Sequence, residues 1–369
     1  MKINILLPFK EKFDEKKASS VSITIKNNLN HSQYINNIQI FGQKTKNPLF
    51  KRNFWGFKYS LLSLKSKNYF LADQMLKVIL KCDDKNQIIE IHNRPYLLNR
   101  IFKKTCKFPI TLFFHNDPKT MRGSKSIIER EKILEQCAAV FCVSEYIRKQ
   151  FLDGIEVNHN KVYVLHNGVD RKMKKFPLKK KEVLFVGRLV LEKGVDLYID
   201  AVSAAAKMFS DWDFGLIGSY RLGNYDNTNS YACKTIKKFK KIGVQAKFYG
   251  FKDHDFVQQK MKDASVIIIP SLWNEPFGLV AAEAMSNGIA IIASQVGGIP
   301  EIIEKNGVLI QNINHTKLEN ALVDLMNNPE KIKLYQKKAW DNFKFSSEAS
   351  SLKLDKHRGF IFRNYFSLS

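Results

Sequence analysis

Residues 266–294 read VIIIPSLWNEPFGLVAAEAMSNGIAIIAS. The apolar run 266–269 predicts a strand that is buried on both faces. Two prolines within residues 270–276 exclude a regular helix there, so we expect this segment to be a loop. Apolar residues recur at three- and four-residue spacing over 279–285, which predicts a helix that ends at Gly288. A strand, a loop and a helix in this order are typical of an open α/β sheet, in which ligands bind beyond the carboxyl ends of the strands.

Three residues of this stretch are candidates for a ligand site. Glu275 is expected in the loop beyond the strand, and Gly278 at the N-terminus of the helix, where anions are favoured. Glu283 lies about one and a half turns inside the helix. An exposed helix residue and an ordinary turn would explain the two glutamates equally well, so the interpretation needs a second match elsewhere in the chain.

That match comes from the apolar run 183–186, which predicts the first strand of a new βα series. Gly187 follows the strand and permits a tight turn. Arg188 and Lys193 then bring two cations to a strand end beside the start of a helix. Such a pair suits a diphosphate, because arginine offers a two-pronged fork and lysine a point charge. The alternative is a solvated turn with ordinary surface cations.

The Glu-Pro-Phe-Gly string at 275–278, together with Glu283, resembles the donor-sugar motif of glycosyltransferase family 4. The resemblance implies that Arg188 and Lys193 bind the diphosphate of a nucleotide sugar, that Glu275 binds the sugar hydroxyls and that Glu283 binds the ribose. It also implies donor contacts from Gly187, Phe251, Phe277, Gly278, Leu279 and Val280. Members of this family retain the anomeric configuration and have the GT-B fold, in which two Rossmann-like domains with parallel sheets face each other across a cleft.

Two predicted strands in the N-terminal half, 88–91 and 109–114, run into His-Asn pairs. Both strings resemble a bacterial branch of the family that works on surface polysaccharides. This resemblance implies that His115 makes a polar contact at the reacting centre, as a catalytic residue beside Glu275. It also implies that other residues line the cleft or bind the acceptor, namely His92, Asn93, Arg94 and Asn116. The alternative for each histidine is a loop residue hydrogen-bonded to the backbone.

The loop after the first predicted strand, 3–9, departs from the family pattern. Family members often carry glycines there, whereas this chain has Ala18, Ser19 and Ser20. Small residues still permit a close approach of the backbone, so Ser19 and Ser20 remain candidate acceptor contacts.

The chain has 369 residues, which suggests two or three domains. We expect an N-terminal, acceptor-binding Rossmann-like domain over 1–172 and a basic linker over 173–181. A C-terminal, nucleotide-sugar-binding Rossmann-like domain is expected over 182–345. The segment 346–369 is helical in pattern and is expected to cross back to the first domain.

The positive charge is concentrated in the N-terminal half. Residues 1–180 hold 35 Lys and Arg against 15 Asp and Glu, a net charge of +20 out of +25 for the chain. Residues 44–70 contain seven Lys and Arg, no acid and many aromatic residues. This pattern suits an anionic membrane surface, and would also suit single-stranded nucleic acid or an amphipathic segment packed on the core.

Other features bound the location and the chemistry. The five cysteines form no Cys-x-x-Cys pair, which argues against a disulfide framework or zinc site. The chain shows no run of eighteen apolar residues and no signal-peptide pattern. We therefore expect a cytoplasmic protein that associates peripherally with the inner face of the plasma membrane. No Asp-x-Asp motif occurs in a suitable position, so we expect no metal and no cofactor besides the donor substrate.

The resemblance therefore implies a retaining hexosyltransferase with a glycan or glycolipid acceptor from lipopolysaccharide or capsule synthesis. A sugar-nucleotide epimerase or a phosphorylase of the same fold is the first alternative. A basic nucleic-acid-binding protein is the second, although the chain has no helix-turn-helix, zinc-finger or aromatic strand signature.

Overall fold

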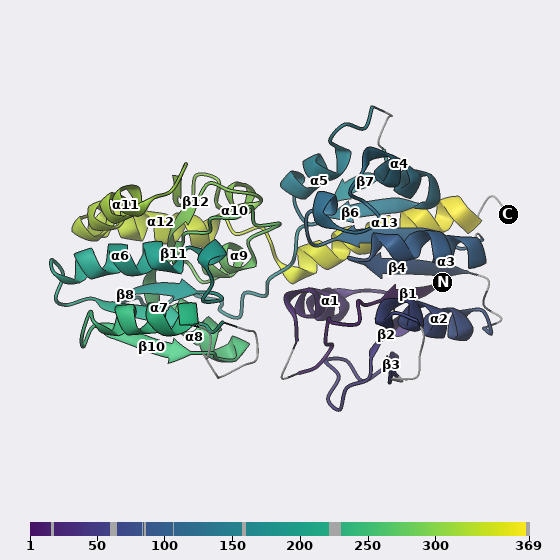
Figure 1. The fold of residues 1–369 in the computed structure, drawn as a ribbon, viewed down its shortest axis with the longest axis horizontal. Coiled ribbons are helices and arrows are strands. Elements are labelled where there is room, and N and C mark those ends of the chain that lie inside the picture. The colour runs from purple at the N-terminus through teal and green to yellow at the C-terminus, as the bar shows by residue number, and fades with distance from the viewer. Residues whose placement is uncertain are drawn as a thin grey trace. The chain divides into compact units, whose positions relative to one another are not determined.

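The computed structural model describes residues 1–15, 18–59, 65–82, 84, 86–105, 107–156, 160–220 and 230–366. The chain divides into two compact units (Figure 1). The first consists of Met1–Gly168 and Phe345–Ser369, and the second of Val169–Lys344. Each unit contains its own parallel sheet, so the expected α/β class with two Rossmann-like domains is confirmed.

The sheet of the first unit has the strand order β3-β2-β1-β4-β5-β6-β7. The pairs in this sheet are parallel. The strand order changes direction between β1 and β4, which places the topological switch point of the sheet there. The strands described in this unit are β1 (Lys2–Leu6), β2 (Ile38–Gln43), β3 (Phe54–Phe57), β4 (Gln87–His92), β5 (Ile110–Phe114), β6 (Ala139–Cys142) and β7 (Val162–Val164).

Helices connect these strands, as parallel pairing requires. The first helix begins directly after Ser19, whose hydroxyl accepts a hydrogen bond from the backbone N–H of Ser22. The α-helices described in this unit are α1 (Ser20–His31), α2 (Lys67–Ile79), α3 (Leu98–Lys104), α4 (Ile127–Gln136), α5 (Glu145–Leu152) and α13 (Ser347–Phe366). Short 3-10 turns lie at Ile35–Asn37, Pro95–Leu97 and Pro118–Thr120.

Strand β3 lies inside the basic, aromatic stretch 44–70. Its register pairs Phe54 with Ile40 and Phe57 with Gln43 of β2. The ring of Phe54 stacks on Phe13 at a centroid distance of 5.6 Å, and the strand's other aromatic rings stack on Phe41. The described aromatic residues of this stretch therefore pack partly on the sheet, while its described Lys and Arg residues are exposed. Residues 60–64 of the same stretch lie outside the described residues.

The sheet of the second unit has the strand order β10-β9-β8-β11-β12-β13, and its pairs are also parallel. Here the direction changes between β8 and β11. The strands described in this unit are β8 (Lys180–Val186), β9 (Asp213–Ile217), β10 (Ala246–Gly250), β11 (Ala264–Ile269), β12 (Ala290–Ser294) and β13 (Val308–Ile310). The predicted strands 183–186 and 266–269 are thus confirmed, and they are neighbours in the sheet.

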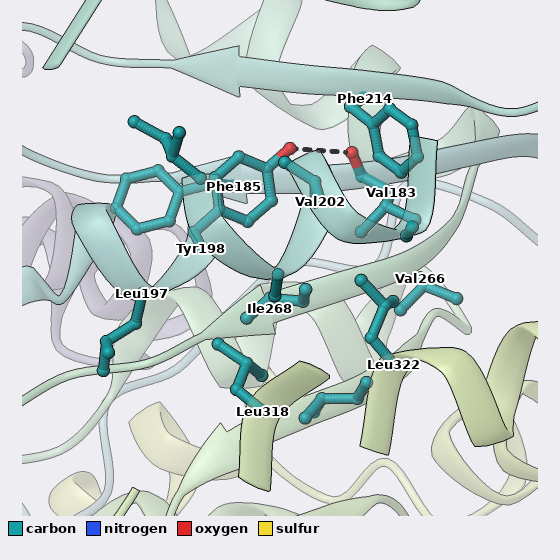
Figure 2. Close-up of a cluster of buried hydrophobic side chains, with 14 of the residues drawn as sticks. Val183, Phe185, Leu197, Tyr198, Val202, Phe214, Val266, Ile268, Leu318 and Leu322 are labelled. Carbon is teal, nitrogen blue, oxygen red and sulfur yellow. Dashed lines mark hydrogen bonds between the residues drawn. The ribbon is translucent and has the colours of Figure 1, made fainter. Parts of the chain in front are cut away.

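Helices surround this second sheet. They are α6 (Val195–Ala206), α7 (Ser230–Lys240), α8 (His254–Asp263), α9 (Leu279–Ser286), α10 (Ile299–Ile303), α11 (His315–Asn327) and α12 (Pro329–Asp341), with a 3-10 turn at Leu191–Lys193. Figure 2 shows the core formed where α6 and α11 meet strands β8, β9 and β11. Tyr198 is fully buried there, and its hydroxyl lies 3.1 Å from the carbonyl oxygen of Val183 and 2.8 Å from that of Gly215.

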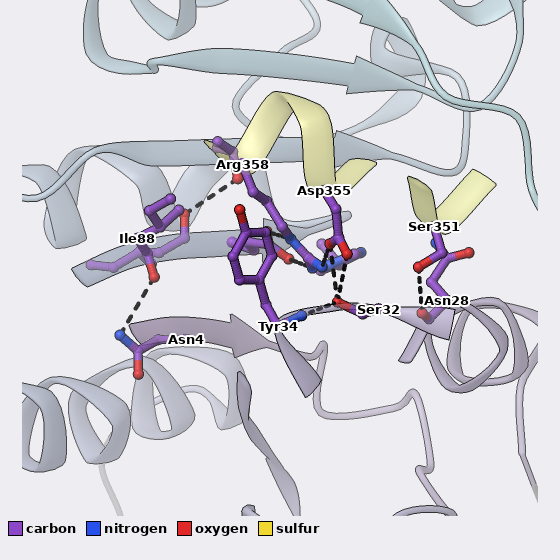
Figure 3. Close-up of polar contacts among 12 residues, drawn as sticks. Asn4, Asn28, Ser32, Tyr34, Ile88, Ser351, Asp355 and Arg358 are labelled. Atoms are coloured by element: carbon purple, nitrogen blue, oxygen red, sulfur yellow. Dashed lines mark hydrogen bonds and ion pairs between the residues drawn. The ribbon is translucent and has the colours of Figure 1, made fainter. Parts of the chain in front are cut away.

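The C-terminal helix α13 packs in the first unit, against α1. A buried ion pair fixes it to the sheet, because the guanidinium of Arg358 makes two 2.8 Å contacts with the carboxylate of Glu90 in β4. Asp355 pairs with the same guanidinium at 3.0 Å and accepts hydrogen bonds from the hydroxyl of Ser32 and the backbone N–H of Gln33 (Figure 3).

The boundary between the units differs from the expected one. The first unit ends at Gly168, four residues before the expected boundary at 172. The segment 173–181, expected to be a linker, lies within the second unit, and β8 already begins at Lys180. The lysines of this segment resemble a solvated linker and gave no sign of a strand. One of them, Lys179, donates hydrogen bonds to three carbonyl oxygens of the second unit, those of Met261, Lys262 and Asn287. No helix among the described residues is long and apolar enough to cross a membrane.

Candidate active site

The two loops that sequence analysis singled out lie at the switch point of the second sheet. One follows β8 and carries Gly187, Arg188 and Lys193, and the other follows β11 and carries Glu275. Because β8 and β11 are adjacent and parallel, both loops leave the sheet at its carboxyl edge. This is the place where open α/β sheets bind ligands.

Side chains from both loops meet at Glu275. The Nζ atom of Lys193 pairs with Oε1 of Glu275, and the hydroxyl of Ser271 donates a 2.7 Å hydrogen bond to the same oxygen. The Glu275 side chain is 10% exposed and that of Lys193 is 21% exposed. The carboxylate is therefore held in one orientation by two donors, and the Lys193 ammonium keeps further donors for an anionic ligand.

Two glycines allow the backbone of these loops to lie this close together. Gly194 has φ +64°, and a Cβ atom there would lie 1.9 Å from the carbonyl oxygen of Pro270. Gly297 has φ +56°, and a Cβ atom there would lie 2.2 Å from the carbonyl oxygen of Glu275. The neighbouring Gly298 donates its backbone N–H to that carbonyl at 2.7 Å. The position of Glu275 is thus set by contacts that no larger residue at 194 or 297 would permit.

The helix after the Glu275 loop begins at Leu279, with Gly278 at its N-cap at φ +98°. Among the described residues no side chain caps this end, so its first backbone N–H groups are available to a ligand beyond Gly278. Phe277 is buried, whereas Leu279 and Val280 are half-buried. Of the donor contacts expected from 277–280, Phe277 is thus a buried packing residue, whereas Leu279 and Val280 at the helix start are partly accessible to a ligand.

Arg188 is exposed and forms no ion pair with any residue that the structure describes. It lies directly after Gly187, whose backbone N–H donates to the carbonyl of Ile217 at 3.1 Å. Phe251 follows β10 and is half-buried. Arg188 is therefore a cation at the carboxyl edge of the sheet that is available to a ligand.

Glu283 has a partner that sequence analysis missed. The Nε2 atom of His254, the first residue of α8, lies 3.0 Å from Oε1 of Glu283. The hydrogen bond to Glu283 raises the pKa of His254, against the effect of burial. Gln258 lies 3.3 Å from the same imidazole nitrogen and accepts a hydrogen bond from Asn287. Glu283 is thus a fixed, largely buried carboxylate and not a solvated helix residue.

The first unit contains a separate polar group at the ends of β4 and β5. His92 Nδ1 and His115 Nε2 lie 2.9 Å apart, and the His92 ring stacks on Phe113. Burial lowers the pKa of His115 to about 4, and burial followed by the charges of His115 and Arg358 lowers the pKa of His92 well below its usual value. Both rings are therefore neutral at pH 7, and one donates its N–H to the other.

Asn93 supports this pair. It adopts the left-handed conformation at φ +53°, and its side-chain oxygen accepts a 2.8 Å hydrogen bond from the backbone N–H of His115. A cavity of about 20 Å³ beside the histidines is lined in part by Glu90 and Arg358. It has room for about one water-sized group, so it does not hold an acceptor sugar.

The other candidate residues of the first unit lie nearer the surface. Ser19 caps α1, and Ser20 is exposed at the start of that helix. Arg94 donates a 2.6 Å hydrogen bond to the carbonyl of Asn93, and Asn116 is exposed. Of these four residues, Ser19 and Arg94 thus have structural hydrogen bonds that their candidate roles did not anticipate.

The sequence pattern indicates no role for Ser271 or His254. Ser271 lies in the same proline-bounded loop as Glu275, four residues before it, which is a signal that could have indicated a contact. His254 gives no such signal, because it is 29 residues from Glu283 in the chain and meets it only through packing of α8 on α9.

Comparison with known proteins bears on the identity of these loops. Residues 168–340 match the family model described as glycosyl transferases group 1, and residues 38–172 match the model described as Glycosyltransferase Family 4. The chain thus contains a Glycosyltransferase Family 4 domain followed by a glycosyl transferases group 1 domain. The motif residues Arg188, Lys193, Glu275 and Glu283 lie within the first of these matches.

Individual relatives of this glycosyltransferase are distant. An uncharacterised glycosyltransferase from Methanocaldococcus jannaschii is 32% identical over 57% of this chain and 58% of that protein. The lipopolysaccharide 1,2-N-acetylglucosaminetransferase of Salmonella typhimurium is 24% identical over 59% of this chain and 57% of its own length. The chain thus spans less than two thirds of the length of either relative.

A solved structure with the same fold is that of HepE from Anabaena in complex with UDP and glucose. It superimposes with a TM-score of 0.76 over 98% of this chain and 100% of HepE, at 17% sequence identity. The expected GT-B fold is therefore confirmed.

Proposed function

We propose that this protein is a retaining hexosyltransferase that moves a sugar from a nucleotide diphosphate donor to an acceptor hydroxyl. The observation that supports it most is the meeting of Lys193 and Glu275 at the switch point of the second sheet, beside the exposed Arg188. A cationic pair next to a fixed carboxylate can bind a diphosphate and a sugar hydroxyl side by side.

The proposed chemistry follows from charge. Breaking the bond to the anomeric carbon leaves negative charge on the departing diphosphate, which Arg188, Lys193 and the helix start at Gly278 stabilise. The anomeric carbon becomes cation-like, as in glycoside hydrolysis. Glu275 orients the sugar through its hydroxyls, and Glu283, held by His254, accepts hydrogen bonds from the ribose. His115 is proposed as a polar contact to the donor sugar from the first unit.

Two comparisons support the substrate classes. HepE was solved with UDP and glucose, which supports a nucleotide sugar as donor. The lipopolysaccharide N-acetylglucosaminetransferase of Salmonella supports a surface-glycan precursor, carried on lipid, as acceptor. A sugar-nucleotide epimerase or a phosphorylase is the alternative, and an assay that separates transfer from isomerisation distinguishes them.

We further propose that the protein lies on the inner face of the plasma membrane. Lys46, Lys51 and Arg52 are exposed, and Trp55 beside them is 41% exposed. Each such cation contributes about 1 kcal/mol near an anionic surface. Sedimentation with anionic but not with neutral liposomes is expected, and replacement of the three cations by glutamate should lower it. Equal binding to both liposome types would contradict this location.

No metal ion or cofactor is required in the proposed mechanism, because Arg188 and Lys193 supply the positive charge beside the diphosphate. Unchanged turnover in EDTA is the expected result, and loss of turnover that Mg²⁺ restores would contradict it.

The direct test of the proposed function is a screen of nucleotide sugars for a rise in melting temperature, followed by an assay of sugar release. One nucleotide class should stabilise the protein and release its sugar. If no nucleotide sugar changes the melting temperature, the proposal is wrong.

A further inference from the structure

A hollow of about 260 Å³ lies at the edge of the first sheet, far along the chain from the donor motifs. It is bounded by Gln43 and Lys44 at the end of β2, by Lys58 and Tyr59 after β3, and by Phe9 and Lys67. Parallel strands β1, β2 and β3 all end there, so the hollow opens at the carboxyl edge of the sheet, where α/β proteins bind ligands.

Three of the five polar side chains that line this hollow are cationic, and the other two are Gln43 and Tyr59. Lys44, Lys58 and Lys67 are exposed, and none of them forms an ion pair in the part of the chain that the structure describes. The described residues that line the hollow include no carboxylate. By contrast, nearby Lys65 is neutralised by Asp73 at 2.6 Å. Three uncompensated ammonium groups around one hollow favour an anion.

Aromatic rings position one of these lysines. The Nζ atom of Lys67 lies 5.3 Å from the ring centroid of Phe9 and 5.7 Å from that of Tyr59. The two rings pack edge to face at 5.8 Å, and the Tyr59 hydroxyl is fixed by a 2.7 Å hydrogen bond to the carbonyl of Lys65. The side chain of Lys67 is therefore held against two aromatic rings, unlike that of an ordinary surface lysine.

The hollow also receives the N-terminus of a helix. Lys67 is the first residue of α2, which is 13 residues long, and no side chain that the structure describes caps this end. The second residue, Asn68, accepts a 2.7 Å hydrogen bond from the backbone N–H of Phe9, which holds the helix start against the end of β1. The partial positive charge of the helix terminus thus adds to the three lysines.

We propose that this hollow binds the phosphate or diphosphate group of the acceptor substrate. The assignment of that anion to an acceptor rests on the proposed function, since the donor diphosphate is assigned to Arg188 and Lys193 in the other unit. Three lysines and a helix terminus match the charge of a phosphate ester, and lysine binds phosphate as a point charge. The volume suits a head group and not a whole glycolipid.

The same chemistry could come from two sources, a phosphorylated acceptor or the head groups of an anionic membrane. Single-stranded nucleic acid fits the hollow less well, because Phe9 is buried and Phe57 is half-buried, which leaves few faces on which bases can stack.

The test uses inorganic diphosphate as the probe and keeps the donor site filled with UDP, or with whichever nucleoside diphosphate binds. Calorimetric titration is made on the full chain, on Lys44→Ala/Lys58→Ala/Lys67→Ala and on a control, Lys46→Ala/Lys51→Ala/Arg52→Ala. The control removes the same charge from exposed positions of the same stretch that do not line the hollow. Binding of each variant to anionic vesicles is measured at the same salt concentration.

The native chain should bind diphosphate with the nucleoside diphosphate already bound, the hollow variant should bind it at least about tenfold more weakly, and the control within about twofold. Equal weakening in both variants would show a general charge effect and overturn the inference. The inference would also be overturned if the hollow variant lost vesicle binding but kept diphosphate binding, because the hollow would then bind lipid head groups. Failure of every nucleoside diphosphate to bind overturns the proposed function instead, which separates the two failures.

Discussion

The hydroxyl of Ser271 donates a 2.7 Å hydrogen bond to the Oε1 atom of Glu275. Lys193 pairs with the same oxygen, so both structural donors occupy one side of the carboxylate. The other oxygen, Oε2, is thereby directed away from these contacts. We infer that Oε2 is the atom that receives the hydroxyls of the donor sugar.

Removal of the Ser271 hydroxyl should therefore affect the donor without affecting the fold. Ser271→Ala is expected to lower kcat/KM for the donor about tenfold, since a hydrogen bond to a charged group contributes about 1.5–3 kcal/mol. The matched control is Ser203→Ala, whose hydroxyl donates a 2.6 Å hydrogen bond to the carbonyl of Ile199 in α6. If both variants keep native kinetics, Ser271 does not position Glu275.

Replacement of Arg188 tests the diphosphate site. Arg188→Ala should cost about 2–4 kcal/mol of transition-state stabilisation, by analogy with the loss of a donor that stabilises developing charge. Because Arg188 is exposed, the melting temperature should change little. Steady-state kinetics are compared with those of Lys207→Ala, an exposed cation after α6. Equal turnover of the two variants would contradict the assignment.

The pair of His254 and Glu283 predicts a dependence of stability on pH. Its hydrogen bond to Glu283 raises the pKa of His254, so the stabilisation is fully present below the pKa of the unfolded chain and is lost as pH rises through the higher pKa of the folded chain. Urea unfolding should show His254→Gln less stable than the native chain near pH 6, by less than about 1 kcal/mol because the imidazole is partly exposed. The difference should disappear toward pH 9, and a difference that grows with pH would contradict the pairing.

The buried pair of Arg358 and Glu90 makes a stability prediction for the first unit. Arg358→Met leaves Glu90 and Asp355 buried without their cation and should lower the free energy of unfolding by about 3–5 kcal/mol. The control Lys344→Met removes an exposed partner of Glu304 and should cost less than about 1 kcal/mol. Denaturant unfolding measures both, and a similar small loss in the two variants would show that α13 is not held by this pair.

The sequence predicted the strands and loops around the donor motifs because strong local signals coincide there. The apolar run 266–269 ends at a proline, and a helical pattern begins after Gly278. The prolines between them exclude a regular helix, which predicts the loop that carries Glu275. The run 183–186 gives the same signal. The adjacency of β8 and β11 then brings the two loops together.

Contacts between distant residues could not be predicted in this way. Lys193 and Glu275 are 82 residues apart, and their pairing depends on the close packing of backbone at Gly194 and Gly297. The sequence pattern does not predict strand β3, because this edge strand has only the four residues Phe54–Phe57 and charged residues lie on both sides of it. The unit boundary was placed too late because the lysines near residue 180 resemble a linker, although Lys179 is bound by carbonyl oxygens.

The central claim is that the second unit binds the diphosphate of a nucleotide sugar through Arg188 and Lys193. Its most direct test is calorimetric titration of the native chain and of Arg188→Ala/Lys193→Ala with nucleoside diphosphates and the matching monophosphates. One nucleoside diphosphate should bind the native chain with a single site, more tightly than its monophosphate, and the double variant should lose at least about a hundredfold in affinity. Absence of binding by every nucleoside diphosphate, or equal affinity in the native chain and the double variant, would contradict the account.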